Sequence, residues 1–324
     1  MALRTRFEVA LRPVQGSRFQ PTGFPDLGPA LFPRPFKYAD GGTGWQDALL
    51  VESPQSMANH LEAVGWDVVD DQPLPVLRAL PWVEVVAHDD GRFLTSSRLE
   101  SHRLAASFIK DSYLDGVSMK DVIRERLGLK DNTPLAPRAI AAAVFALDPL
   151  CLLHGVFFAE TAKVWPGQPR IARVITSVIE AHDVRRAESG GVKRDAVAHS
   201  KGEGQDAAGG YGSIPFGRTE WTAADIVLYA AIDNAQLGAY GLSEAATALL
   251  SAVAKWEIRS VIDNGLRLRT ACDLEAIGEV DGLPAVEALR SEIAGLVSDG
   301  IPELADVVAP MRVVWRGGVG KGKE

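Results

Sequence analysis

The chain has 324 residues, 47% of them hydrophobic, so it is long enough to bury one large core or two modest ones as a globular protein. Its 34 Lys+Arg and 42 Asp+Glu give a formal net charge of −8, which argues against a protein that coats nucleic acid with its whole surface. With only two cysteines and no apolar run of the roughly 18 residues that a membrane span needs, we expect a cytoplasmic protein without a disulfide framework or membrane association.

The N-terminal part predicts a strand, an irregular segment and a helix. Residues 6–14 alternate between apolar and polar side chains, and the loop that follows, residues 15–19, could wrap a ligand. About thirty residues rich in proline and glycine come next, and we expect them to form an ordered excursion. Ser53 followed by Pro54 then predicts a helix N-terminus, with Met57 and Leu61 facing a core.

The first turn of that helix is a candidate phosphate-binding site. Ser53, Gln55 and Ser56 are small or neutral donors beside the unpaired backbone N–H groups of a helix N-terminus, where the helix dipole favours an anion. On the sequence alone, an ordinary capped helix explains the same residues.

Strands and helices interleave over the rest of the chain without a strict βαβ rhythm. The patterns predict strands at 81–87, 92–100, 150–158, 266–270 and 307–315, and helices at 137–147, 243–264 and 284–300. The strand at 150–158 is interrupted by His154 and Gly155. We therefore expect an α+β fold with a mostly antiparallel sheet.

Residues 170–242 form the segment around which the chain is organised. Two strand-like arms, 174–181 and 224–230, flank a glycine-rich stretch, 185–217, which lacks a packing pattern and is expected to be a mobile hairpin tip. Between residues 185 and 201 only Glu188 and Asp195 oppose five cations: Arg185, Arg186, Lys193, Arg194 and Lys201. A flexible cationic finger on an acidic protein suggests a phosphate partner, and a solvated linker is the alternative.

Catalytic and metal chemistry find little support in the sequence. The six histidines do not show the spacing of a zinc site, and the neighbours His182 and Asp183 would point to opposite faces of a strand. Lys321 lies between two glycines near the C-terminus, but no Walker pattern surrounds it. We expect no catalytic residue, no metal and no cofactor.

Five motifs carry a resemblance to a known family, and they lie at residues 11–26, 51–59, 97–100, 152–155 and 265–274. With these motifs the sequence resembles the RAMP-superfamily backbone subunit of CRISPR Cascade effectors, most closely the type I-U (I-G) variety. The resemblance spans nearly the full chain, and the first two motifs are specific. The resemblance implies an RRM-like, ferredoxin-like palm formed by residues 1–169 and 218–324. It also implies a β-hairpin thumb at 170–242, with a flexible tip at 185–217.

The resemblance also implies a function in antiviral defence, as a non-catalytic subunit that binds guide RNA independently of its sequence. The implied partners are the guide crRNA, the target DNA strand paired to it, copies of the chain itself in a filament, the large subunit and the crRNA-processing subunit. The RNA-binding residues expected from the motifs and the local charges are Arg12, Gln15, Gly16, Ser17, Arg18, Phe19, Ser53, Gln55, Ser56, Asn59, Ser97, Arg98, Arg170, Arg173, Lys193, Arg194, Lys201 and Lys321.

Two alternatives remain open at this stage. The first is a metal-dependent RNA endonuclease of the same superfamily, in which Asp195 or Asp206 would be the acidic loop residue. The second is a purely structural assembly subunit that never touches RNA. The aromatic pair with which RRM domains stack bases is not evident on the candidate strands, so recognition of the RNA backbone is the preferred interpretation.

Overall fold

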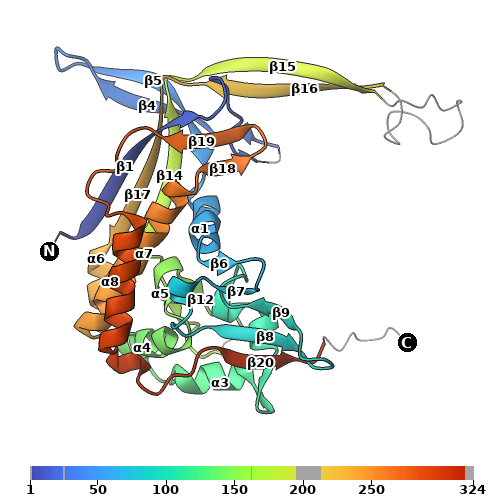
Figure 1. The fold of residues 1–324 in the computed structure, drawn as a ribbon, viewed down its shortest axis with the longest axis vertical. Helices are drawn as coiled ribbons and strands as arrows, with labels where there is room; N and C mark the ends of the chain where they lie inside the picture. Colours follow the sequence, from blue (N-terminus) through green and yellow to red (C-terminus); the bar gives the residue numbers. More distant parts are fainter. Residues whose placement is uncertain (1, 25, 162, 195–212, 318–324) are drawn as a thin grey trace, which may run out of the picture.

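The computed structural model describes residues 2–24, 26–161, 163–194 and 213–317 of the chain. Two β-sheets lie one above the other in Figure 1, and a group of helices joins them, so that the chain has the outline of a hook. A long two-stranded ribbon projects from the upper sheet, and the strand nearest the C-terminus belongs to the lower one. The predicted α+β class with mostly antiparallel sheets is confirmed.

The upper sheet has seven strands in the order β18-β19-β1-β17-β14-β5-β4, and every neighbouring pair is antiparallel. Along its central strands every second residue is buried, as the period of two in a half-covered sheet requires. Its strands are β1 (Arg4–Pro13), β4 (Leu31–Lys37), β5 (Thr43–Glu52), β14 (Ile175–His182), β17 (Asp225–Asp233), β18 (Leu266–Arg269) and β19 (Cys272–Ala276).

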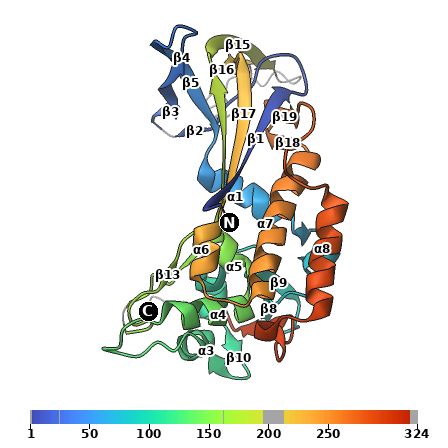
Figure 2. The same cartoon turned by 90° about the vertical axis from the view of Figure 1, so that its left-hand side faces the viewer.

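Helices cover the buried face of this sheet. Helix α1 (Pro54–Ala63) packs on β14, and α7 (Glu244–Asp263) packs on β17 and β19. Helix α8 (Val286–Asp299) lies on the outer side of α7 (Figure 2). The short helix α6 (Asn234–Ala239) connects β17 to α7. Ser53 and Ser243 cap α1 and α7 as predicted, since their hydroxyl groups accept hydrogen bonds from the amides of Ser56 and Ala246.

The lower sheet has five strands in the order β11-β10-β20-β8-β9, in which only β20 and β8 run parallel. Its strands are β8 (Val83–Ala87), β9 (Phe93–Ser96), β10 (Tyr113–Leu114), β11 (Val117–Ser118) and β20 (Met311–Trp315). The nearby helices are α2 (Ser107–Lys110), α3 (Met119–Arg126), α4 (Pro137–Leu147) and α5 (Leu150–His154). The remaining short elements are the strands β2 (Gly23–Phe24), β3 (Gly28–Pro29), β6 (Trp66–Asp67), β7 (Gln72–Pro73), β12 (Val156–Phe157) and β13 (Arg170–Ile171), and the 3₁₀ turns at Pro75–Leu77, Arg103–Ala105 and Pro302–Leu304.

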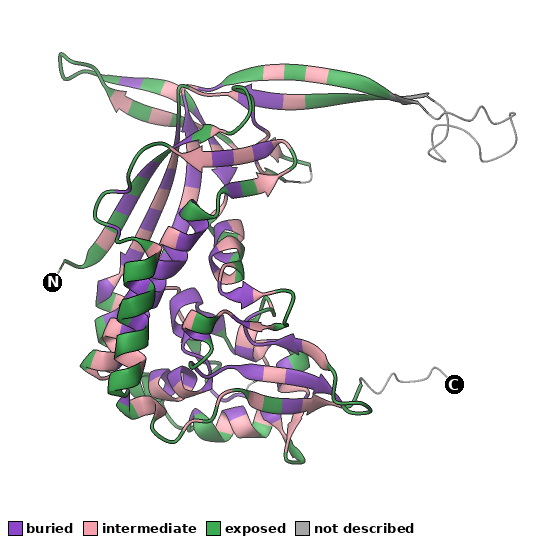
Figure 3. Cartoon of the chain, viewed as in Figure 1, coloured by how far each residue is buried: buried purple, intermediate pink, exposed green. Residues whose placement is uncertain are grey.

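The prediction of one strand over residues 150–158 is wrong, because α5 occupies its first half. All five residues of α5 are buried (Figure 3), and an uninterrupted apolar run has no periodicity that distinguishes a buried helix from a buried strand. Gly155 ends α5 with φ +80°, and a Cβ there would lie 2.9 Å from the carbonyl oxygen of Ile171. The glycine is therefore required for the turn from α5 into β12.

The predicted arms of the projecting hairpin are placed differently in the structure. Both are strands, but β14 and β17 lie at the centre of the seven-stranded sheet. The ribbon begins beyond them, with β15 (Arg185–Arg194) paired to β16 (Ser213–Thr222) (Figure 1). Much of the stretch expected to lack regular structure thus forms an antiparallel ladder, in which the ring of Phe216 lies over Gly191. Residues 195–212 lie outside the described residues.

A set of buried ion pairs joins the segments between the two sheets. Arg98 donates hydrogen bonds to the carbonyl groups of Leu77, Leu80 and Pro81, and its Nε lies 3.7 Å from Asp148. The Ser97 hydroxyl donates to the same carboxylate at 2.5 Å. The expectation that Ser97 and Arg98 contact RNA is therefore wrong, because both side chains are buried. Their contacts instead hold the turn that follows β9 in place.

His154 and Glu257 form a second buried pair, with 3.0 Å between Nε2 and Oε2. Burial by itself would lower the pKa of His154, but the Glu257 carboxylate opposes this and the net direction is upward. Burial raises the pKa of Glu257, which His154 partly offsets. Glu257 thus favours the protonated form of His154, and the contact joins α5 to α7.

We expect Glu257→Gln to lower the free energy of unfolding by about 3 kcal/mol at pH 6, because it removes the carboxylate that favours the protonated form of the buried His154. A histidine whose folded pKa is raised stabilises fully below its unfolded value of 6.5, and this contribution is lost as pH rises through the folded pKa. Urea unfolding at pH 6 and pH 8.5 should therefore show a smaller difference between wild type and variant at the higher pH. A difference that stays constant would contradict the ion pair.

We expect Arg98→Ala to destabilise the fold by about 3 kcal/mol, because Asp148 would remain buried without its cation. Arg290→Ala is the matched control, since Arg290 is half exposed and pairs with Glu287 on the surface of α8. Thermal unfolding of both variants measures the effect. Equal melting temperatures would show that Arg98 is not a core residue.

Candidate nucleic-acid interface

The loop at residues 14–18 lies at the base of the ribbon, where three distant parts of the chain meet. The amide of Val14 donates to the carbonyl of Asp273 at 2.9 Å, and the amide of Gln20 donates to that of Ala271 at 2.7 Å. Gly16 has φ +66°, a backbone conformation that favours glycine. Both ends of the loop are therefore fixed by the turn between β18 and β19.

Phe19 anchors this loop from the inside. Its amide and carbonyl groups exchange hydrogen bonds of 2.9 and 2.8 Å with Trp221 at the base of β16, and its side chain is fully buried. The expectation that Phe19 contacts RNA is wrong, because no face of its ring is open to a base. The aromatic ring instead contributes apolar burial that holds the loop against the ribbon.

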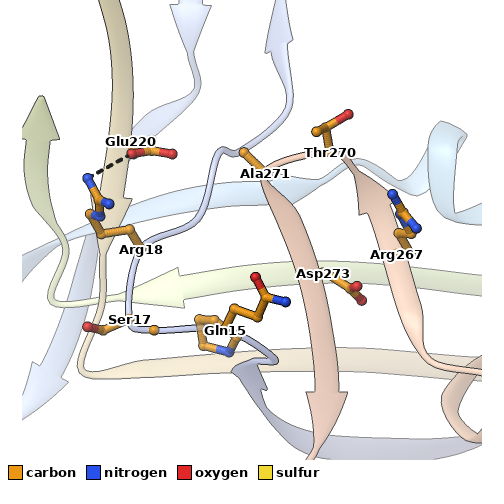
Figure 4. Close-up of a pocket in the computed structure, with 10 residues that line it drawn as sticks. Gln15, Ser17, Arg18, Glu220, Arg267, Thr270, Ala271 and Asp273 are labelled. Atoms are coloured by element: carbon orange, nitrogen blue, oxygen red, sulfur yellow. Dashed lines mark ion pairs between the residues drawn. The ribbon is translucent and has the colours of Figure 1, made fainter. Parts of the chain in front are cut away.

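A cavity of about 360 Å³ opens between the loop and the β18–β19 turn, and Figure 4 shows its side chains. Gln15, Ser17 and Arg18 come from the loop, Glu220 comes from β16, and Arg267, Thr270 and Asp273 come from the β18–β19 turn and its strands. Its walls therefore offer two guanidinium groups, an amide, two hydroxyl groups and two carboxylates. The structure brings together four of the predicted residues here, Gln15, Gly16, Ser17 and Arg18, and adds Arg267 and Thr270, which the sequence did not indicate.

The arginines at this corner are held by exposed or half-exposed ion pairs. Arg18 lies 3.2 Å from Glu220, and Arg12 lies 2.7 Å from Glu275 on the neighbouring strand. The side chains of Arg12 and Arg18 are 64% and 54% exposed, but the carboxylate of Glu220 is largely buried whereas that of Glu275 is half-exposed. Arg12 can therefore exchange its carboxylate for a phosphate at little cost, whereas Arg18 would leave a largely buried carboxylate with one cation fewer.

The start of α1 presents polar groups as the sequence predicted. Gln55 and Asn59 are exposed, and Ser53 and Ser56 are partly exposed. Arg173 reaches this end of the helix, where its guanidinium donates to the carbonyl of Pro54 at 3.0 Å. Burial lowers the pKa of Arg173, and nearby Arg103 adds to this effect. A cation thus lies beside the positive end of a helix, an arrangement that an anion would stabilise.

Arg269 links the loop to the strand that leads into α1. Its guanidinium donates to the carbonyl of Gln20 at 2.8 Å and to that of Val51 at 3.3 Å, and it pairs with the buried carboxylate of Glu52. Sequence reasoning did not select this residue, although the alternation of residues 266–270 predicted its strand. A regular alternation shows which residues share a face and not which of them bridges to another segment.

The other predicted contacts lie elsewhere or cannot be placed. Arg170, on β13, stacks its guanidinium over the ring of Phe157 at 4.1 Å. Lys193 and Arg194 belong to β15, of which only the backbone is described at these two positions. Lys201, Lys321, Asp195 and Asp206 lie outside the described residues.

The described residues also bear on two other classes of site. In the ranges 2–24, 26–161, 163–194 and 213–317, no group of three or more His, Cys, Asp or Glu side chains could hold a metal ion. In the same part of the chain, every helix is too short or too polar to cross a membrane.

Comparisons with known proteins identify the family. Residues 5–186, more than half of the chain, match the family model described as CRISPR-associated protein GSU0053. No curated protein matches the sequence. One solved chain that matches is described as "CRISPR RNA-guided surveillance complex, pre-nicking", with 14% sequence identity, a TM-score of 0.39, and coverage of 84% of this chain and 74% of that one. The family assignment rests on the sequence match: the chain belongs to the CRISPR-associated GSU0053 family.

Proposed function

We propose that this chain binds guide RNA without catalysing its cleavage, as the repeating backbone subunit of a type I CRISPR effector complex. The proposal is carried by the corner where the loop at 14–18 meets the base of the ribbon and is linked through Arg269 to the strand that leads into α1, in a member of a CRISPR-associated family. Exposed arginines, neutral donors and a helix N-terminus are the groups that bind phosphates.

The chemistry of this corner suits a subunit that must accept any guide. Contacts to phosphates position a strand but carry no sequence information, whereas recognition of sequence needs contacts to base edges. At this corner Phe19 and Trp221 are buried, whereas Phe216 on β16 is 41% exposed near Gln20 and could stack on any base without reading its identity. Affinity would come from several weak ionic contacts, each of which any RNA can make.

The acidic remainder of the chain fits the same function. A net charge of −8 disfavours RNA bound over the whole surface and leaves the arginine-bearing corner as the preferred place. The proposed partners are the guide crRNA, the target DNA strand paired to it, further copies of this chain in a filament, the large subunit and the crRNA-processing subunit. The projecting ribbon would act as the thumb that closes over the strand.

We expect the affinity for single-stranded RNA to fall steeply with salt. If about four phosphates are neutralised, the slope of log K against log salt concentration should be about −3. Fluorescence anisotropy across a salt series measures the slope. Arg12→Ala and Arg18→Ala should each make it shallower by about 0.7, whereas Arg290→Ala on α8 should leave it unchanged. A flat dependence in the wild type would rule out binding through phosphates.

We expect Gln55→Glu to weaken RNA binding about tenfold at low salt, because a carboxylate in the first turn of α1 would repel a bound phosphate. Ala288→Glu is the matched control, since it adds the same charge at an exposed position near the start of α8. Equal affinities of the two variants would show that the start of α1 does not face the RNA.

A further inference from the structure

We propose that the cavity between the loop at 14–18 and the β18–β19 turn binds the ribose of one nucleotide and makes the chain prefer RNA to DNA. Asp273 would accept a hydrogen bond from the 2′-hydroxyl group, and Arg267 would neutralise the adjoining phosphate. This inference rests on the proposed function and assigns a specificity to part of the same interface.

The two carboxylates of the cavity differ in the number of hydrogen-bond and ion-pair partners that they already have. Glu220 is largely buried and already receives Arg18 at 3.2 Å, Arg218 at 3.9 Å and the Ser189 hydroxyl at 3.1 Å. Asp273 is half-buried, and within the described parts of the chain no side chain lies within hydrogen-bond or ion-pair distance of its carboxylate. Glu220 therefore holds the side chains around it in place, while the carboxylate of Asp273 is available to a ligand.

Arg267 stands beside Asp273 on the neighbouring strand. The two residues are paired in the β18–β19 ladder, so both project from the same face of the sheet. Over the described ranges, Arg267 likewise has no carboxylate within 4.0 Å. An acceptor and a cation thus stand next to each other on one wall, with Gln15 opposite them (Figure 4).

This pattern fits a ribose better than a phosphate alone. A phosphate placed between two carboxylates would be repelled, whereas a hydroxyl group donates a strong hydrogen bond to a carboxylate. RNA differs from DNA by the 2′-hydroxyl group, which can donate such a bond. A sugar contact also keeps binding independent of base sequence, as the proposed function requires. The cavity volume of about 360 Å³ lies within the range of small-molecule sites.

The test compares single-stranded RNA and DNA of one mixed sequence, each labelled at the 5′ end, by fluorescence anisotropy with the full-length protein at fixed salt. The wild type should bind the RNA more tightly. Asp273→Ala should lower the ratio of RNA affinity to DNA affinity about tenfold, as loss of a hydrogen bond to a charged group predicts, because the loss of the negative charge itself affects both strands alike. Asp273→Asn retains an acceptor oxygen and should keep part of the preference.

Two variants serve as controls. Glu275→Ala removes the same charge from the same face of β19, two residues further along, outside the cavity. It should change the affinities for RNA and DNA by the same factor. Arg267→Ala should weaken both, because both strands carry the phosphate. Thermal unfolding establishes that each variant is folded. If the alanine variant does not fold, the RNA and DNA affinities of Asp273→Asn are compared instead.

The outcomes separate the two proposals. Equal binding of RNA and DNA by the wild type, or a preference that survives Asp273→Ala, would overturn the ribose site and leave guide binding intact. A wild-type protein that binds neither strand would overturn the proposed function, and the ribose site with it.

Discussion

The candidate interface depends on how Arg269 ties three segments together. Its guanidinium contacts the carbonyl groups of Gln20 and Val51 and the carboxylate of Glu52, which is 2% exposed. These contacts fix the exit of the loop at 14–18 against the strand that leads into α1. Without these contacts, the loop at 14–18 and the start of α1, which carry the exposed donors, would be joined only through the sheet. A guanidinium suits this task, because its planar set of donors serves several acceptors at once.

Arginines in this chain serve two different purposes, and burial separates them. Arg98 lies in the core, where carbonyl groups accept from its two terminal nitrogens and Asp148 lies 3.7 Å from Nε, so it cannot be offered to a ligand without unfolding its surroundings. Arg12 stands at the surface in a weak pair that a phosphate can replace, and Arg18 is exposed beside the largely buried Glu220.

The sequence predicts the parts of the fold whose signals are local. The cap at Ser53, the helix of residues 137–147 and the long helix that begins after Ser243 all follow from capping and periodicity, and the structure confirms them. The polar first turn of α1 also follows from the sequence, and of the loop predicted at 15–19 residues 15–18 are exposed while Phe19 is buried.

The errors among the predicted site residues share one cause, which is that burial depends on distant segments. Phe19, Ser97 and Arg98 carry chemistry that suits RNA, but the partners that bury them are Trp221, Asp148 and the chain near Leu80. The same limit explains why Arg267 was not selected, since its position beside the loop depends on the contact between Gln20 and Ala271. Local patterns also could not show that β14 and β17 lie inside the main sheet.

The central claim is that this corner grips the backbone of a guide RNA without reading its bases. The most direct measurement is size-exclusion chromatography of the full-length protein, expressed alone and with each of two guide RNAs of unrelated sequence. The account predicts that either guide produces a particle far larger than the 34.7 kDa chain, absorbing strongly at nucleic-acid wavelengths, with the same elution volume for both. Elution as an RNA-free monomer in every case, or assembly with only one of the guides, would contradict it.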